Sequence, residues 1–402
     1  MDIRSIATFP LRGHQPDGQT YWGAATWGGE PRGATYPHPS RTSFVYASGI
    51  ETVLVRLETE SGWVGWGESK APVGCLATAE LIDALLAPAI EGMSILDREV
   101  VWERMSNAMA VRGHDAGFWT EALSGIDIAM WDALGRALDQ PIATMLGGIF
   151  WPEITCYASG VPVAAYANQM GGLERVRDHV ELLRADGWSA MKLAIGSSPT
   201  FDLAAIATAR DALGDDGRLF VDAAGAYDKL QAIEICDRLT DYGVEFFEMP
   251  VPPDQLDVYA ELAARSKVPL ALDSLHTASR ARDFLVRSAL GVVQPDVCRA
   301  GGITGSRRIS ELADRFGVRA TPHVSIGSAV HFAASLQLAA ATPNLATMEH
   351  WVGTNPLGAT IAPDLHDPIA GQRSIGSEAG LGITIDEAAV RSLSIGTLQA
   401  EG

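Results

Sequence analysis

The first part of the chain alternates hydrophobic and polar positions in the way expected of a β-hairpin. In residues 50–70, alternating apolar residues lie on both sides of a Ser-Gly turn at 61–62. Residues 76–110 and 120–141 instead space their apolar positions as helices do, and Pro141 ends the second segment. These patterns predict a β-hairpin followed by helices.

After residue 150 the pattern becomes rhythmic. Short apolar runs, the first of them "ITCYASG", end in polar residues, and amphipathic helical segments such as 200–214 and 255–266 separate them. The residues that end the later runs are spaced 23 to 30 residues apart and are Lys192, Asp222, Glu248, Asp273, Asp296, His323 and Glu349. One βα unit needs about that length, so the pattern predicts an α/β fold with a (β/α)8 TIM barrel.

The ionisable residues at these run ends are the candidate functional residues. In such a barrel the carboxyl ends of the strands converge on one face, and that face carries the active site. A polar residue at one strand end can simply meet solvent. Seven successive strands that all end in ionisable residues favour a site instead.

Residues 12–48 have a different character, since they are rich in glycine, proline and aromatic residues. A long loop in a compact protein is usually functional or disordered, and the aromatic residues argue against plain disorder. We therefore predict a lid-like loop over the site, with surface packing as the alternative. Trp22, Trp27 and Tyr36 are the candidate substrate contacts.

Composition narrows the choice of partners. Apolar residues make up 47% of the 402 positions, charged residues 20%, and the formal net charge is −19, which argues against nucleic-acid binding. No apolar run reaches a membrane-spanning length of about 18 residues, and the N-terminus lacks a signal-peptide pattern. The four cysteines, Cys75, Cys156, Cys236 and Cys298, lie far apart, as free thiols do. We expect a cytoplasmic protein.

The carboxylates of Asp222, Glu248 and Asp273 end three successive strands. They would repel one another and raise each other's pKa unless a cation neutralised them. Oxygen ligands suit a hard ion, so we predict Mg²⁺, with Mn²⁺ as the alternative. Zinc is disfavoured because neither histidine nor cysteine ends those strands.

Asp296 and His323 end the next two strands, where an aspartate can fix the tautomer of an imidazole and raise its basicity. His323 is therefore a candidate general base or acid, with a structural His–Asp pair as the alternative. Lys192 could bind a substrate carboxylate, act as a second acid/base, or simply extend to solvent. A divalent cation opposite a base indicates abstraction of the proton α to a carboxylate, giving an enediolate.

Several motifs together resemble the enolase superfamily, on the side of mandelate racemase. They are "GIDIAMWDALGRALDQPIATMLGG", "VDAAGAY", "FFEMPVPP", "QPDVCRAGGITG" and "TPHVSIGSAVH". The resemblance implies an α+β capping domain at 1–125 that includes the lid-like loop, a modified barrel at 126–365, and a C-terminal segment at 366–402 that returns to the capping domain. It also implies a homo-oligomer, with dimers and octamers as alternatives.

By this resemblance Asp222 and Glu248 are the first two metal ligands, Asp296 and His323 form the catalytic dyad, and Glu349 hydrogen-bonds the substrate carboxylate. Asp273 falls where muconate lactonizing enzymes place a ligand aspartate.

The chain also departs from the family pattern. Ala224 and Met249 replace the usual Asn and Glu, and Ala194 replaces the second lysine of a Lys-x-Lys base motif.

The missing second base favours a one-sided reaction on a small-molecule carboxylate. We expect a lyase that removes the α-proton and eliminates a β-hydroxyl, as a dehydratase of acid sugars or related hydroxy acids does. A cycloisomerase or epimerase of a sugar lactone or carboxylate is the alternative. A second alternative is a binding protein with a decayed site.

Overall fold

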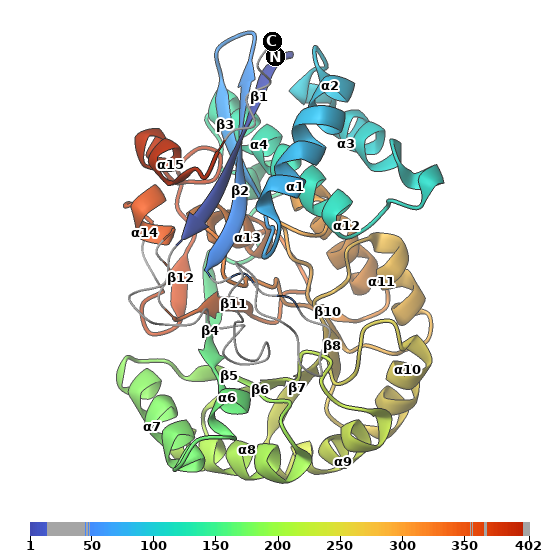
Figure 1. The fold of residues 1–402 in the computed structure, drawn as a ribbon, viewed down its shortest axis with the longest axis vertical. Helices are drawn as coiled ribbons and strands as arrows, with labels where there is room; N and C mark the ends of the chain where they lie inside the picture. The colour runs from blue at the N-terminus through green and yellow to red at the C-terminus, as the bar shows by residue number, and fades with distance from the viewer. Residues whose placement is uncertain are drawn as a thin grey trace.

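An antiparallel sheet forms one end of the molecule (Figure 1). The computed structural model describes residues 1–13, 45, 47, 49–353, 355, 357–365 and 368–396. The sheet order is β1 (Ile3–Gly13), β2 (Ile50–Thr59) and β3 (Val64–Ser69). The predicted hairpin at 50–70 is confirmed, and Gly62 supplies the positive φ of 85° that its turn requires.

The predicted helix at 120–141 is confirmed as α4 (Phe118–Leu138), which packs on the sheet. Residues 76–110 are helical too, but they do not form one regular helix. The first stretch becomes π-helical just before Pro88 and ends before Gly92, which has a positive φ of 74°. The pieces are α1 (Cys75–Leu81), a π-helical turn η2 (Ile82–Leu86), α2 (Ala87–Ile90), η3 (Ile95–Asp97), α3 (Arg98–Asn107) and η4 (Ala110–Arg112).

The rest of the chain forms the predicted barrel of parallel strands. The strands are β4 (Glu153–Val161), β5 (Ala190–Ala194), β6 (Arg218–Asp222), β7 (Val244–Glu248), β8 (Leu270–Leu272), β9 (Val292–Val293), β10 (Arg319–Ala320) and β11 (Met348–Trp351). From β4 to β10 each strand pairs with the next along the chain, and β11 pairs with β4. A bridge between Ala320 and Leu345 links β10 to the segment before β11, so the ring closes. An additional strand, β12 (Gln372–Ser374), pairs antiparallel with β4.

Helices cover the outside of the barrel (Figure 1). They are α5 (Ile142–Met145), α6 (Val163–Tyr166), α7 (Gly172–Ala185), α8 (Pro199–Leu213), α9 (Lys229–Leu239) with η5 (Thr240–Tyr242), α10 (Leu256–Arg265), α11 (Ala278–Leu285), α12 (Gly302–Arg315), α13 (Ala329–Ala340) and α14 (Gly358–Ile361). The last helix, α15 (Glu387–Leu393), packs beside β1, where Ile395 donates its backbone N–H to Pro10 at 2.9 Å. All four cysteines are buried free thiols.

An aromatic layer fills the interior of the barrel. Tyr157, Phe220 and Phe246, from β4, β6 and β7, form one buried cluster with small residues of the intervening and following strands. The rings of Phe220 and Phe246 stack with centroids 4.4 Å apart. Because side chains alternate across a strand, the residue two positions further along each strand also faces inward. This aromatic layer therefore forms the floor beneath the side chains at the carboxyl ends of the strands.

Gly67 lets α4 lie directly against the capping sheet. A Cβ at this position would lie 1.9 Å from the backbone oxygen of Gly125 in α4. We expect Gly67→Ala to lower the free energy of unfolding by about 3 kcal/mol, because a buried backbone cannot move away cheaply. Urea unfolding measures the change. Gly358→Ala is the control, since its nearest neighbour atoms lie at an ordinary 3.6 Å, and equal stabilities would contradict the packing argument.

Candidate active site

The predicted run-end residues meet above the aromatic floor because of strand parity. Lys192, Asp222, Glu248 and Asp273 each lie two positions after a residue of the floor layer, so their side chains also point into the barrel. In the strand register Asp222 is opposite Glu248, whereas Lys192 is opposite Phe220 and Glu248 is opposite Ala271, so the polar residues are staggered along the barrel. Together they form a polar layer at the carboxyl ends of the strands, beyond the aromatic residues.

Lys192 is the central cation of this polar layer. Its Nζ lies 2.7 Å from Glu248 Oε2, 2.7 Å from Glu349 Oε1 and 3.9 Å from Asp222 Oδ2. Burial opposes its charge, but Glu248 and Glu349 outweigh burial and raise the pKa of Lys192 well above its usual value. Lys192 is therefore an ammonium group shared between carboxylates, on the side of the barrel opposite His323.

The carboxylates outnumber their neutralising cations. Burial, with repulsion from neighbouring carboxylates, raises the pKa of Asp222 well above its usual value and also raises that of Glu248. One ligand atom each from Glu248, Asp273 and His323 lie within 4.8 Å of one another. Asp222 faces the same layer, but its Oδ1 accepts the backbone N–H of Ala224 at 2.8 Å. This oxygen-rich, underneutralised cluster fits a hard divalent cation.

His323 and Asp296 form the predicted dyad. His323 Nδ1 lies 2.9 Å from Asp296 Oδ2, which leaves Nε2 directed at the carboxylates, 3.6 Å from Asp273 Oδ2 and 3.5 Å from Glu349 Oε2. Burial lowers the basicity of the ring, but Glu349 and the Asp296 hydrogen bond prevail and raise the pKa of His323 to about 9. The imidazole has the geometry of a base that faces the site with Nε2.

Glu349 joins the two sides of the site. Its Oε1 binds Lys192, and its Oε2 accepts the backbone N–H of Val324 at 2.9 Å. Although burial disfavours the carboxylate form, Lys192 and His323 lower the pKa of Glu349 to about 2. Glu349 is therefore ionised and held between the lysine and the histidine.

Two residues that depart from the family pattern, Ala224 and Met249, have an unusual backbone conformation. Ala224 and Met249 closely follow the strand ends of β6 and β7, and both adopt positive φ, 46° and 40°. Non-glycine residues in this region are uncommon and tend to mark functional sites. The chain therefore turns sharply after Asp222 and Glu248, and the backbone N–H of Ala224 donates to Asp222 Oδ1.

Sequence reasoning missed two residues of the polar layer. Gln294 donates from Nε2 to Glu248 Oε2 at 2.8 Å and is fully buried. The side chain of Ser159 hydrogen-bonds to Glu349. Ser159 lies two positions after Tyr157 and Gln294 two after Val292, both of which belong to the floor layer. Strand parity would have identified both, whereas the search for ionisable run ends did not.

A third missed residue comes from the capping sheet. Lys70 follows β3, is buried, and donates to Ser325 Oγ and to the backbone oxygen of Ile326, the latter at 3.0 Å. It thereby holds the segment that follows His323. No local pattern signals this contact, because it joins residues that are far apart in the sequence.

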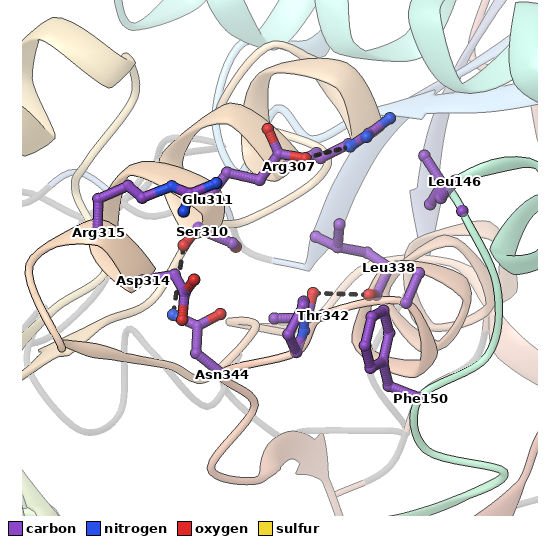
Figure 2. A pocket seen from close by; sticks show the side chains of 13 residues that line it. Leu146, Phe150, Arg307, Ser310, Glu311, Asp314, Arg315, Leu338, Thr342 and Asn344 are labelled. Atoms are coloured by element: carbon purple, nitrogen blue, oxygen red, sulfur yellow. Dashed lines mark hydrogen bonds and ion pairs between the residues drawn. The ribbon is translucent and has the colours of Figure 1, made fainter.

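The predicted substrate contacts Trp22, Trp27 and Tyr36 lie outside the described residues. A separate pocket of about 340 Å³ lies between α12, the end of α13 and residues 146–150 (Figure 2). Figure 2 shows Phe150 and Leu338 on one wall and the Arg307–Glu311 ion pair on another. None of the predicted site residues lines this pocket, so it is distinct from the polar layer of the barrel.

A second group of donor atoms lies behind the dyad. Asp296, Cys298 and His331 bring ligand atoms within 4.8 Å of one another. Burial raises the pKa of the Cys298 thiol well above its usual value, and Asp296 is already bonded to His323. A protonated thiol and a shared carboxylate make this group a poor metal site.

A capped (β/α)8 barrel whose strand ends gather carboxylates, a lysine and a His–Asp pair defines the enolase superfamily class of proteins. Comparison of the sequence with family models makes the assignment specific. Residues 32–147 match the N-terminal domain of mandelate racemase / muconate lactonizing enzyme, and residues 175–389 match the enolase C-terminal domain-like family. The chain belongs to this mandelate racemase/muconate lactonizing enzyme family.

Individual relatives agree with that assignment. D-galactarolactone cycloisomerase of Agrobacterium fabrum is 34% identical over 84% of this chain and 90% of the relative. Arabinonate dehydratase of Saccharolobus solfataricus is 30% identical over 84% of this chain and 88% of the relative. A solved member of the enolase superfamily from Agrobacterium tumefaciens has a TM-score of 0.87 and 28% identity, covering 98% of both chains.

The Lys192 ion pairs predict a pH-dependent loss of stability in Lys192→Met. Removing one partner of a buried charge network costs about 3–5 kcal/mol, because the remaining charges are unpaired. Glu349 is stabilised as a carboxylate in the folded protein, so this contribution is present above its unfolded pKa and is lost as pH falls toward about 2. The deficit of Lys192→Met should therefore be large at pH 7 and shrink in acid.

Urea unfolding of the metal-free protein between pH 7 and pH 3 measures this dependence. Lys229→Met is the matched control, since its ion pair with Glu261 is exposed, at 44% and 46% of the two side chains. An exposed pair contributes about 0–1 kcal/mol. A deficit in Lys192→Met that is no larger than the control, or that grows in acid, would contradict the assigned charge network.

Proposed function

We propose that the protein is a Mg²⁺-dependent hydro-lyase that removes the proton α to a carboxylate and eliminates a β-hydroxyl, as a dehydratase of acid sugars or related hydroxy acids. One observation carries the proposal: His323 directs its Nε2 at the carboxylate cluster, 3.6 Å from Asp273 Oδ2 and 3.5 Å from Glu349 Oε2. The site therefore has a base on one side and carboxylate-binding groups on the other.

His323 is the proposed base. Asp296 accepts from Nδ1, so in the neutral imidazole the lone pair is on Nε2, the nitrogen that can take the α-proton. A dication bound beside Nε2 would favour this neutral form over the imidazolium of the metal-free protein. The imidazolium formed can then deliver that proton to the β-hydroxyl when both groups lie on one face of the substrate. The C–H and C–O bonds break, water leaves, and the resulting enol tautomerises to a 2-keto acid.

The opposite face has no second base at the position where the family pattern supplies one. Ala194 is opposite Asp222 in the register and carries no titratable group. Lys192 is held by Glu248 and Glu349. A one-sided base favours elimination over inversion of the α-carbon, which needs acid/base groups on both faces.

Asp222, Glu248 and Asp273 would hold the metal ion, as their concentrated negative charge indicates. When bound, Mg²⁺ supplies positive charge beside the substrate carboxylate. Lys192 is the proposed donor to the same carboxylate. Glu349, which is ionised in the structure, supports that role by holding the ammonium group in place.

The relatives support this class of reaction and also support a second candidate. The name of arabinonate dehydratase indicates the proposed type of elimination. The name of D-galactarolactone cycloisomerase favours the cycloisomerase alternative. Product analysis by NMR separates a 2-keto acid from an isomerised lactone. The dyad and the acidic cluster oppose a binding protein with a decayed site, and absence of α-proton exchange in every acid sugar tested would favour it.

The setting of the reaction is part of the proposal. The substrate is a small-molecule carboxylate, and the enzyme works as a cytoplasmic homo-oligomer. The predicted lid-like loop at 12–48 lies almost entirely outside the described residues. Within the described residues, no helix is long and apolar enough to cross a membrane. We retain the divisions 1–125, 126–365 and 366–402, because α15 packs on β1 of the capping sheet.

The metal assignment predicts that Asp222→Asn loses Mg²⁺ affinity. The substitution removes one of three negative charges proposed to face a dication, so we expect a weakening of at least about tenfold. Isothermal titration calorimetry with Mg²⁺ measures it, and chelation should abolish activity. Asp215→Asn, an exposed acid before β6, is the control. Wild-type Mg²⁺ affinity in Asp222→Asn, or full activity after exhaustive chelation, would refute the assignment.

The one-sided base predicts the stereochemistry of hydrogen exchange. In D₂O, a hydroxy acid that lacks a β-leaving group should exchange its α-proton in one configuration only, with retention. His323→Asn should slow this exchange by ~10²–10⁴-fold, the usual contribution of a general base. NMR of the recovered acid measures both rate and configuration. Equal exchange of the two antipodes would contradict the one-sided base. Loss of exchange in Lys192→Ala but not in His323→Asn would make Lys192 the base.

A further inference from the structure

Asp296 is shared between two imidazoles. Its Oδ2 lies 2.9 Å from His323 Nδ1, and its Oδ1 lies 3.0 Å from His331 Nε2. Oδ1 also accepts the backbone N–H of Cys298 at 2.8 Å. Burial would favour the neutral acid, but His331 and His323 together lower the pKa of Asp296 well below its usual value. Both oxygens of the Asp296 carboxylate are therefore already in contact with polar groups of the protein.

His331 has a confined position. It is the third residue of α13 and is fully buried. Within the described part of the chain neither ring nitrogen forms a well-aligned hydrogen bond, and this includes Nε2, which faces Asp296. Gly327 packs against the ring, since a Cβ there would lie 2.6 Å from His331 Nδ1. Asp296 is thus the polar group at hydrogen-bond distance from this imidazole, and a small ring rotation would align the two.

The capping sheet fixes the helix that carries His331. Glu68 of β3 accepts the backbone N–H of Ser328 at 2.8 Å and of His331 at 2.9 Å, and it accepts the Ser328 hydroxyl at 2.5 Å. These groups form the N-terminus of α13, where a carboxylate is stabilised by unpaired N–H groups and the helix dipole. The position of His331 is therefore set by a contact between the capping sheet and the barrel.

We propose that His331 is a positioning residue for the dyad. It holds Asp296 Oδ1, so that Oδ2 faces His323 Nδ1 and the free Nε2 of His323 faces the substrate. The torsion of an aspartate carboxyl group is broad and roughly two-fold, so contacts at both oxygens are needed to fix its plane. His331 adds a side-chain contact to the backbone N–H of Cys298 at Oδ1 and so limits rotation of the plane further. The inference rests on the proposed function, because it assigns His331 a role in proton transfer by His323.

His331→Leu removes the contact and keeps an apolar side chain of related size, while His331→Gln keeps a nitrogen donor near the position of Nε2. We expect His331→Leu to slow α-proton exchange by about tenfold to a hundredfold, since a 1 Å misplacement costs about that much. Its KM and Mg²⁺ affinity should stay unchanged, and His331→Gln should restore most of the rate. Equal rates for His331→Leu and the wild type would overturn the proposal.

A second measurement does not depend on substrate or metal. The low-field Nδ1 proton of His323 reports its bond to Asp296, and proton NMR of the metal-free protein should show it shifted or broadened in His331→Leu and retained in His331→Gln. If His331→Leu does not fold, His331→Asn replaces it, because its amide is one methylene too short to reach Asp296. An unchanged resonance in a folded Leu or Asn variant would overturn the proposal even if no acid sugar proves to be a substrate.

Discussion

The ammonium group of Lys192 between Glu248 and Glu349 is the interaction on which the site depends. Each of these two buried carboxylates lies 2.7 Å from the ammonium group, so loss of the ammonium would leave both charges buried and unpaired. The same network sets the charge of its neighbours, because the ionised Glu349 favours the protonated form of His323. A substitution of Lys192 is therefore expected to change the charge state of His323 as well as that of the carboxylate cluster.

The barrel and most of its polar layer could be predicted from sequence because both depend on local, repeated patterns. A strand shows its two-residue alternation, and a βα unit shows its length, so these two patterns are enough to place Asp222, Glu248 and Asp273 on one face of the barrel. The dyad followed in the same way from Asp296 and His323. Gln294 was missed for a physical reason: it is uncharged, so the search for ionisable run ends passed over a position that strand parity marks clearly.

Contacts between the capping sheet and the barrel could not be predicted. Lys70 reaches Ser325 and Ile326, and Glu68 binds the N-terminus of α13, across about 260 positions of sequence. Such contacts depend on how two packed units meet, and a single sequence carries no local signal for that. The broken helical stretch at 76–110 is a milder case, because the apolar spacing was read correctly while the break at residues 91–94 was not.

These long-range contacts give the capping sheet a part in the chemistry beyond covering the barrel. The end of β3 binds the segment after His323 through Lys70 and the start of α13 through Glu68, so both sides of the dyad are attached to the same strand. A shift of the sheet would move the segment after His323 and the helix that carries His331 together. The capping sheet therefore holds the segments that carry His323 and His331, and the proposed proton transfer by His323 depends on this packing as well as on the barrel.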